Sequence, residues 1–202
     1  MSPRRIGILA FEGVDLLDLG GPYEVFLTAS RLAVGGGEPP PFEVVVIGAG
    51  TGPIHAYGGL AIVPHVAADA VDGLDVLVVP GAIAIDDVAA DPATVEAVRR
   101  LLRVAELPAS VCTGAFLLAD AGALADRPWT THWEDVPALA ARLGSTRGRP
   151  GVRWVDAGDV VTSGGLSSGI AMALHLVDRL AGRGLAERTA RQLDYAWEAE
   201  PG

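Results

Sequence analysis

The sequence contains a single cysteine, Cys112, among 202 residues. A lone thiol cannot close an intramolecular disulfide, so stability must come from a hydrophobic core, which a chain of this length can bury. The first residues, Met1-Ser-Pro-Arg-Arg5, lead straight into a short strand-like segment and lack the apolar stretch of a secretory signal. We therefore expect a cytoplasmic protein.

Long apolar runs and basic residues are also scarce. The two longest apolar runs, around residues 111–125 and 170–181, are interrupted by charged side chains, whereas a membrane span needs about 18 or more unbroken apolar residues. The chain has 15 basic against 25 acidic residues, a formal net charge of -10. Such a charge repels the phosphate backbone that nucleic-acid-binding proteins attract. The sequence thus argues against membrane and nucleic-acid partners.

Short apolar segments alternate with helical patterns along the chain, in which 50% of the residues are hydrophobic. Segments typical of buried parallel strands are residues 6–11, 42–47, 74–79 and 108–112. Helical patterns cover residues 22–32, 92–104, 167–181 and 185–197. Two segments with a central glycine turn, residues 54–63 and 152–162, are typical of β-hairpins.

This alternation predicts an α/β fold: a doubly wound, mostly parallel sheet with helices on both faces and the hairpins appended to it. We interpret residues 1–202 as a single domain. Ligand sites in such folds lie beyond the carboxyl ends of the strands. The glycine run in residues 44–52 is similar to a dinucleotide fingerprint, but Pro53 stands where its third glycine is needed and a hairpin follows in place of a helix.

Cys112 lies where a predicted strand turns sharply into a predicted helix, in the stretch "ASVCTGAFLL". The turn Thr113-Gly114 between them is typical of a nucleophile elbow, which pushes the nucleophilic side chain out of the core. The positive end of the following helix is expected to favour the thiolate, the reactive form of the thiol. The alternative is that Cys112 is a small buried hydrophobic residue, as free cysteines often are.

Acidic residues follow the first predicted strand: Asp15, Asp18 and Glu24. Taken singly, each of them fits a helix cap or a solvated residue. Asp18, which has leucines on both sides, is the one most easily drawn into the core. A buried carboxyl beside a sulfur nucleophile can hold or deliver a proton, provided that burial keeps it protonated part of the time.

Six motifs spread over most of the chain carry a family resemblance. They are Leu17-Asp-Leu-Gly-Gly-Pro22, Val78-Val-Pro-Gly81, Ser110-Val-Cys-Thr-Gly114, Thr130-Thr-His-Trp133, Thr162-Ser-Gly-Gly165 with Ser168-Gly169, and Gln192-Leu-Asp-Tyr195. With these motifs the chain resembles the ThiJ/PfpI superfamily, whose fold is flavodoxin-like and of the class I glutamine amidotransferase type. Within the superfamily it looks most like the isonitrile (isocyanide) hydratases.

The resemblance implies roles for particular residues. Cys112 matches the nucleophile, and Asp18 matches the carboxyl that contacts it, which is usually Asp in the hydratase branch and Glu in the deglycase branch. Thr113 stands where the peptidase branch has His, which disfavours peptidase activity. The implied reaction is attack of the thiolate on an isocyanide, followed by hydrolysis of a thioimidate to an N-substituted formamide.

The resemblance also implies an oxyanion hole and a substrate pocket. Backbone N–H groups near Gly81, Ala82 and Thr113 would stabilise negative charge. Because relatives usually have glycine where Ala82 stands, that alanine is strained if the position needs a positive φ. The expected pocket residues are His132, Trp133, Gly165 and Leu166. Each has a structural alternative. His132 fits a histidine whose hydrogen bonds serve only the structure, Trp133 fits core packing, and Gly165 and Leu166 fit a tight turn before a helix.

Three functions remain open. They are hydration of small isocyanides, glyoxalase or deglycase activity on reactive carbonyls, and a non-catalytic sensing domain similar to that of AraC-type regulators. Such regulators continue into a DNA-binding region, and the length of this chain argues against a complete regulator. The resemblance implies a homodimer and no cofactor, and the scattered histidines support no metal site.

Overall fold

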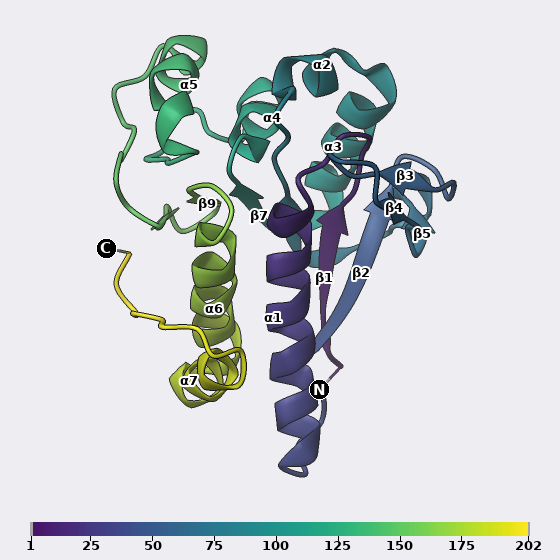
Figure 1. The fold of residues 1–202 in the computed structure, drawn as a ribbon, viewed down its shortest axis with the longest axis vertical. Helices are drawn as coiled ribbons and strands as arrows, with labels where there is room; N and C mark the ends of the chain where they lie inside the picture. The colour runs from purple at the N-terminus through teal and green to yellow at the C-terminus, as the bar shows by residue number, and fades with distance from the viewer. Residues whose placement is uncertain (1, 202) are drawn as a thin grey trace.

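The computed structural model describes residues 2–201, and their centre is a seven-stranded sheet (Figure 1). The strand order is β5-β2-β1-β6-β7-β9-β8. The strand bounds are Arg4–Leu9 (β1), Phe42–Gly48 (β2), Val66–Ala67 (β5), Leu74–Val79 (β6), Ala105–Val111 (β7), Trp154–Asp156 (β8) and Val161–Ser163 (β9). Neighbouring strands are parallel except for β8, which runs antiparallel to β9. This confirms the predicted doubly wound, mostly parallel sheet.

Helices cover both faces of the sheet. The helices α1 (Leu16–Gly35), α6 (Ser168–Ala181) and α7 (Arg183–Gln192) pack together in front of it in Figure 1. The helices α3 (Pro92–Val104) and α4 (Gly114–Asp120) pack against β6 and β7 on the other face, and α2 (Ile85–Ala90) and α5 (Val136–Leu143) lie beside α4 at the top of Figure 1. No helix within residues 2–201 is long and apolar enough to cross a membrane.

The central strands are apolar on both faces because both faces are covered. In β6 the side chains of Val76, Leu77, Val78 and Val79 are all fully buried, although successive side chains of a strand point to opposite faces. Such a run lacks the alternation of a half-exposed strand, which is why it could be identified as a buried parallel strand from the sequence.

The first helix begins earlier than predicted. Helix α1 starts at Leu16, not at residue 22, because the side chain of Asp15 caps it by accepting the N–H of Leu17 at 3.1 Å. Pro22 therefore lies inside the helix, although proline favours a first turn. The earlier start places Asp18 in the first turn of α1, directly above the end of the sheet.

The two predicted hairpins take different positions. Residues 54–63 form the predicted hairpin, β3 (Ile54–His55) and β4 (Ala61–Ile62), as an antiparallel ribbon that is not hydrogen-bonded to the main sheet. Residues 152–162 form β8 and β9, which do join the sheet. Helix α2, helix α5, strand β5 and two 3-10 turns (Ala68–Ala70 and Trp133–Asp135) were not predicted. The last helix, α7, ends at Gln192, earlier than predicted.

The order of the strands defines where a site can form. From β1 the chain moves to β2 on one side, and later to β6, β7 and β9 on the other side. The carboxyl ends of these parallel strands meet at one edge of the sheet, where the crevice for a ligand is expected. The segments that follow β1, β6, β7 and β9 carry the Asp18, Gly81, Cys112 and Gly165 motifs.

Candidate active site

Cys112 follows directly after β7 and has a backbone φ of 56°, in the left-handed region that non-glycine residues rarely adopt. Its N–H donates to the carbonyls of Ser163 and Gly164, each at 3.2 Å. Its carbonyl accepts the hydroxyl of Thr131 at 2.7 Å. These bonds from two neighbouring segments hold the strained conformation, so the strand-to-helix elbow predicted from the sequence is confirmed.

A close backbone approach fixes the direction of the elbow. A Cβ atom placed on Gly114 would lie 2.1 Å from the carbonyl oxygen of Val79, at the end of β6. Only glycine fits there, since backbone atoms cannot yield to a clash of that size. The first turn of α4 therefore packs against the end of β6. The Cys112 thiol consequently lies beside the segment that follows β6.

Asp18 lies beneath the thiol and is fully buried, as predicted. Its Oδ2 accepts the N–H of Gly81 at 3.1 Å, and its Oδ1 accepts the N–H of Leu166 at 3.0 Å. The neighbouring Cys112 thiol also lowers the pKa of this carboxyl. Burial, helped by the nearby charge of Asp15, raises the pKa of Asp18 to about 7 despite these bonds. The carboxyl is therefore partly protonated at neutral pH.

The environment of Cys112 disfavours a free thiolate. Burial raises the pKa of the Cys112 thiol far above its usual value, and the negative charge of Asp18 raises it further. The N–H of Thr113 bonds the sulfur and lowers the pKa, but this is the smaller effect. The expectation that the helix terminus favours the thiolate is therefore wrong for the resting site, because α4 is short and the thiol is mostly buried.

The thiol faces a cavity of about 220 Å³ at this edge of the sheet. The lining residues are Asp15, Ala82, Ile83, Cys112, Thr113, His132, Glu134, Asp135 and Leu166. Cys112 is only partly buried, so a small molecule can reach the sulfur, while Asp18 stays below the surface. Glu24, the third acid considered from the sequence, is remote from this cavity and accepts the hydroxyl of Thr28 one turn further along α1.

The predicted pocket residues divide between two adjoining hollows. His132 and Leu166, whose φ is 53°, line both hollows. Trp133 and Gly165 line the second hollow, of about 490 Å³. Trp133 is 71% exposed, so core packing of this residue is excluded. Gly165 separates the two hollows: a Cβ there would lie 2.4 Å from the His132 ring and 3.3 Å from the Cys112 Sγ.

The predicted oxyanion hole is only partly available. Ala82 does not have a positive φ, so the backbone strain considered for an alanine at this position is absent. Its N–H, however, donates to Thr113 Oγ1 at 2.9 Å, and the same hydroxyl donates back to the Ala82 carbonyl at 2.8 Å. The N–H of Gly81 is bound to Asp18. In the resting site, therefore, neither the Gly81 N–H nor the Ala82 N–H is free to stabilise a developing anion. Of the three predicted donors, the N–H of Thr113, which lies at the sulfur, remains available for that role.

Sequence reasoning missed four residues of this site: Thr131, Ile83, Glu134 and Asp135. Thr131 holds the Cys112 carbonyl, and the other three line the cavity. Three of the four flank the predicted pair His132 and Trp133 in the chain, so the motif located the segment but not the roles within it. In the sequence, nothing distinguishes the acidic pair Glu134 and Asp135 from two solvent-exposed residues of a turn.

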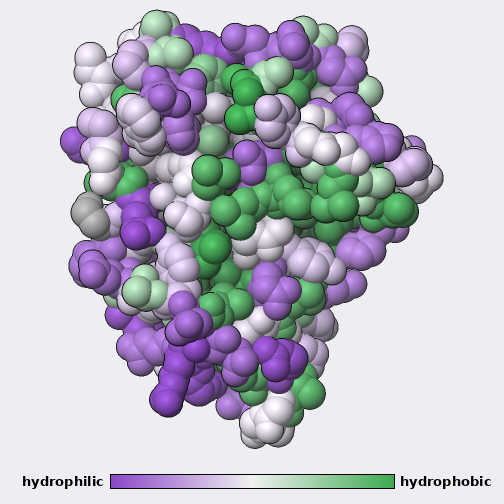
Figure 2. Space-filling model, in the orientation of Figure 1, coloured by the Kyte–Doolittle hydropathy of each residue, from purple (hydrophilic) through white to green (hydrophobic). Residues whose placement is uncertain are grey.

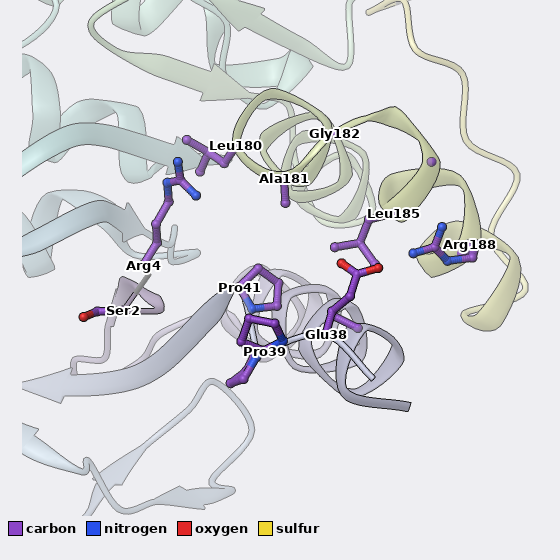
Figure 3. Close-up of a pocket in the computed structure, with 13 residues that line it drawn as sticks. Ser2, Arg4, Glu38, Pro39, Pro41, Leu180, Ala181, Gly182, Leu185 and Arg188 are labelled. Atoms are coloured by element: carbon purple, nitrogen blue, oxygen red, sulfur yellow. The ribbon is translucent and has the colours of Figure 1, made fainter. Parts of the chain in front are cut away.

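Another hollow, of about 560 Å³, lies at the opposite end of the sheet. Figure 3 shows Arg4 and Arg188 on its two sides, with Glu38 between them. It contains none of the predicted site residues. Within residues 2–201, no group of three or more His, Cys, Asp or Glu side chains is placed to hold a metal ion. The candidate site is therefore the smaller cavity above Cys112 and Asp18.

Comparison with known proteins places the chain in a family. The DJ-1/PfpI family matches residues 4–179. Isonitrile hydratase of Pseudomonas putida is 32% identical over 95% of this chain and 78% of its own. The transcriptional regulator GlxA of Rhizobium meliloti is 28% identical over 98% of this chain but 60% of its own length. A ThiJ/PfpI family crystal structure from Pseudomonas syringae superposes with a TM-score of 0.83 at 25% identity, covering 98% of this chain and 77% of that one.

Proposed function

This chain belongs to the DJ-1/PfpI family, and from that premise we propose that it hydrates small isocyanides to N-substituted formamides through a covalent bond to Cys112. One observation carries the proposal. The thiol sits on a strained elbow at an open cavity, and next to it, below the cavity surface, lies a fully buried carboxyl whose pKa is raised to about 7. Addition to an isocyanide requires a nucleophile and, beside it, a group that can accept and return a proton near neutral pH.

The first step joins sulfur to carbon. Cys112 passes its proton to Asp18, and the thiolate attacks the terminal carbon of R–N≡C. The electron pair left on that carbon takes the proton back from Asp18, giving a thioimidate, R–N=CH–S–Cys112. The N–H of Thr113, which faces the sulfur, stabilises the thiolate before attack and again when it leaves.

The second step adds water. Ionised Asp18 accepts a proton from the attacking water, whose oxygen bonds to the thioimidate carbon, and passes this proton to the nitrogen, which leaves R–NH–CH(OH)–S–Cys112. Collapse of this adduct forms the C=O bond, expels the Cys112 thiolate and releases R–NH–CHO, and the remaining proton returns to the Asp18–Cys112 pair. One water molecule is added to the isocyanide, and the enzyme returns to its starting state.

A second candidate function is the sensing of a small molecule. Its support is the similarity to GlxA, which extends over 98% of this chain. In that case the cavity would bind its ligand without turnover. Glyoxalase or deglycase activity on reactive carbonyls is a third candidate, since the same thiol and carboxyl suit attack on a carbonyl carbon.

The proposal includes a homodimer, for which an exposed apolar surface gives support. Leu16 and Leu17 at the start of α1, Tyr57 in the β3–β4 turn and Ile83 are each at least 40% exposed. Backbone bonds bring them together around Val14, which pairs with Ala82 and accepts the N–H of Tyr57. Figure 2 shows the apolar band crossing this face and reaching its edge over the β3–β4 ribbon. An apolar surface of this kind is typical of a protein–protein contact.

The test is an assay of formamide production from cyclohexyl isocyanide, run in parallel with an assay of methylglyoxal loss. We expect formamide from the unchanged protein and a loss of at least about 1,000-fold in Cys112→Ala, with the same thermal unfolding midpoint. Equal turnover by both proteins would rule out covalent catalysis. Cys112-dependent loss of methylglyoxal without formamide would support the carbonyl activity instead, and saturable binding without turnover would support a sensor.

A further inference from the structure

The cavity above Cys112 has a strongly one-sided charge. Three carboxylate residues line it, Asp15, Glu134 and Asp135. Among the lining residues, His132 is the single one that can carry a positive charge, and no arginine reaches the cavity. Ile83 and Leu166 supply apolar walls. A molecule that approaches the sulfur therefore meets an apolar surface and a negative rim.

The carboxylates are held in place by the fold. Asp15 is the cap of α1, fixed by the N–H of Leu17. Glu134 and Asp135 lie in the 3-10 turn that follows His132, with carboxylate oxygens 3.8 and 3.4 Å from its Nδ1. Even a protonated His132 would balance only one of the three charges. The rim thus stays negative whether the histidine is charged or neutral.

The charge of the rim reaches the reacting atom. The charges of Asp15 and Asp135 both raise the pKa of the Cys112 thiol, in addition to the effect of Asp18. In a narrow cavity with protein walls, field lines are concentrated and are screened less than at an open surface. A negative substituent on a substrate would be repelled at the same position where a positive one would be attracted.

We propose that this cavity selects its substrates by charge, accepting small molecules with an apolar body that are neutral or carry an ammonium group, and excluding those with a carboxylate. Under the proposed function, from which the reaction is taken, the substrates are neutral and amine-bearing isocyanides. The charge selection itself rests on the rim of the cavity and can be measured at the thiol without any turnover.

The experiment uses the fact that Cys112 is the single thiol of the chain. The unchanged protein is treated with three methanethiosulfonates: cationic trimethylammonium-ethyl, neutral methyl and anionic sulfonatoethyl. Each second-order rate constant is divided by that for the urea-unfolded chain, which removes the intrinsic reactivity of the reagent. We expect the folded protein to favour the cationic over the anionic reagent by at least about tenfold at low salt, with a smaller ratio at high salt.

A pair of matched variants separates the rim from the overall charge of -10. The double variant Glu134→Gln/Asp135→Asn removes two charges at the rim, and the control Glu38→Gln/Glu43→Gln removes two charges at the other end of the sheet. We expect the cation-to-anion ratio to fall several-fold in the rim variant and to change little in the control. Equal changes in the two variants, or no preference in the unchanged protein, would overturn the proposal.

Turnover supplies an independent comparison. We expect kcat/KM for methyl isocyanoacetate to exceed that for the isocyanoacetate anion by at least about tenfold, and the rim variant to narrow this difference. Formamide production at equal rates from both would overturn charge selection and leave the proposed function standing. Charge-selective thiol modification without any formamide would overturn the proposed function and leave charge selection standing.

Discussion

Cys112 and Asp18 share their protons as a single titrating pair. Burial penalises the charged form of each group, and the negative charge of Asp18 raises the pKa of the Cys112 thiol further, whereas the neutral thiol lowers the pKa of Asp18. The first proton therefore leaves the pair near pH 7, while the second is held far into the alkaline range. In the proposed mechanism, the reactive state is the tautomer of the singly protonated pair that has the proton on Asp18 and a thiolate on Cys112, whereas the resting pair keeps this proton on the sulfur.

This sharing predicts the pH dependence of the reaction. We expect kcat/KM for formamide production to rise through an apparent pKa near 7 and then to stay level up to the alkaline limit of stability, because loss of the second proton requires a much higher pH. In Asp18→Asn we expect a rate lower by roughly 100-fold to 10,000-fold and no inflection near 7. A flat profile in the unchanged protein, or the same inflection in the variant, would contradict this assignment.

The same carboxyl makes stability depend on pH. The pKa of Asp18 is raised from 3.8 to about 7 on folding, so between these values the folded chain holds a proton that the unfolded chain has lost. The free energy of unfolding should therefore fall as pH rises from about 4 to 7 and then level off, by an amount on the order of 4 kcal/mol. Urea unfolding at pH 4, 6 and 8 measures this.

The variant Asp18→Asn is the control for this stability measurement, because an amide at position 18 does not titrate. Its amide must turn an NH₂ toward one of the two backbone donors, which costs stability equally at every pH. Relative to the unchanged protein, the variant should therefore become more stable as pH rises. Parallel pH curves for the two proteins would show that the pKa of Asp18 is not raised by folding.

At the scale of single residues, the sequence predicted what depends on position and missed what depends on side-chain geometry. Cys112 and Asp18 could be found because each follows a strand whose carboxyl end lies at the site edge. The hydrogen bond from the Ala82 N–H to the Thr113 hydroxyl could not be predicted, since it depends on the rotamer of Thr113. The high pKa of the thiol also follows from burial, which no spacing of residues reveals.

Elements with a strong apolar pattern were predicted well, and those set by local bonds were not. Strand β6 and helix α3 have the predicted bounds. The start of α1 depended on a competition between two signals, a capping Asp15 and a proline that favours a first turn, and the cap prevailed. Helices α2 and α5 are short, so their periodicity spans too few turns to be recognised.

The loop between β9 and α6 offers a test at this scale. In Gly165→Ala the added Cβ would lie 2.4 Å from the His132 ring, a side chain that can move, and 3.3 Å from the Cys112 Sγ. We expect the fold to persist and the rate of formamide production to fall at least about tenfold, because the methyl group crowds the sulfur and displaces His132.

Gly164→Ala is the matched control, since its Cβ would lie 3.2 Å from the Ser168 hydroxyl and away from the thiol. We expect this variant to keep most of its activity. The measurements are kcat/KM for both variants together with their thermal unfolding midpoints. Equal activity losses in the two variants would indicate a general disturbance of the loop, and full activity in Gly165→Ala would show that the gap between His132 and the sulfur is not used.

At the scale of the whole molecule, alternation of strands and helices was sufficient to predict the sheet and the edge that holds the site. It could not place the β3–β4 ribbon, because two-residue strands carry no pattern that distinguishes an appended hairpin from a separate one. The position of this ribbon matters for assembly, since it extends the apolar surface at the start of α1.

The proposed homodimer predicts the effect of a charge within that surface. Leu17 is 42% exposed at the start of α1. If an arginine replaced it and were buried against a second copy, the free energy lost by desolvating its charge would exceed the free energy gained from the contact. We expect the unchanged protein to sediment as a dimer at micromolar concentration and Leu17→Arg as a monomer. Val34→Arg, at the other end of α1 where the side chain is 54% exposed, should remain a dimer. A monomeric unchanged protein, or a dimer of undiminished stability in Leu17→Arg, would contradict an interface over the start of α1.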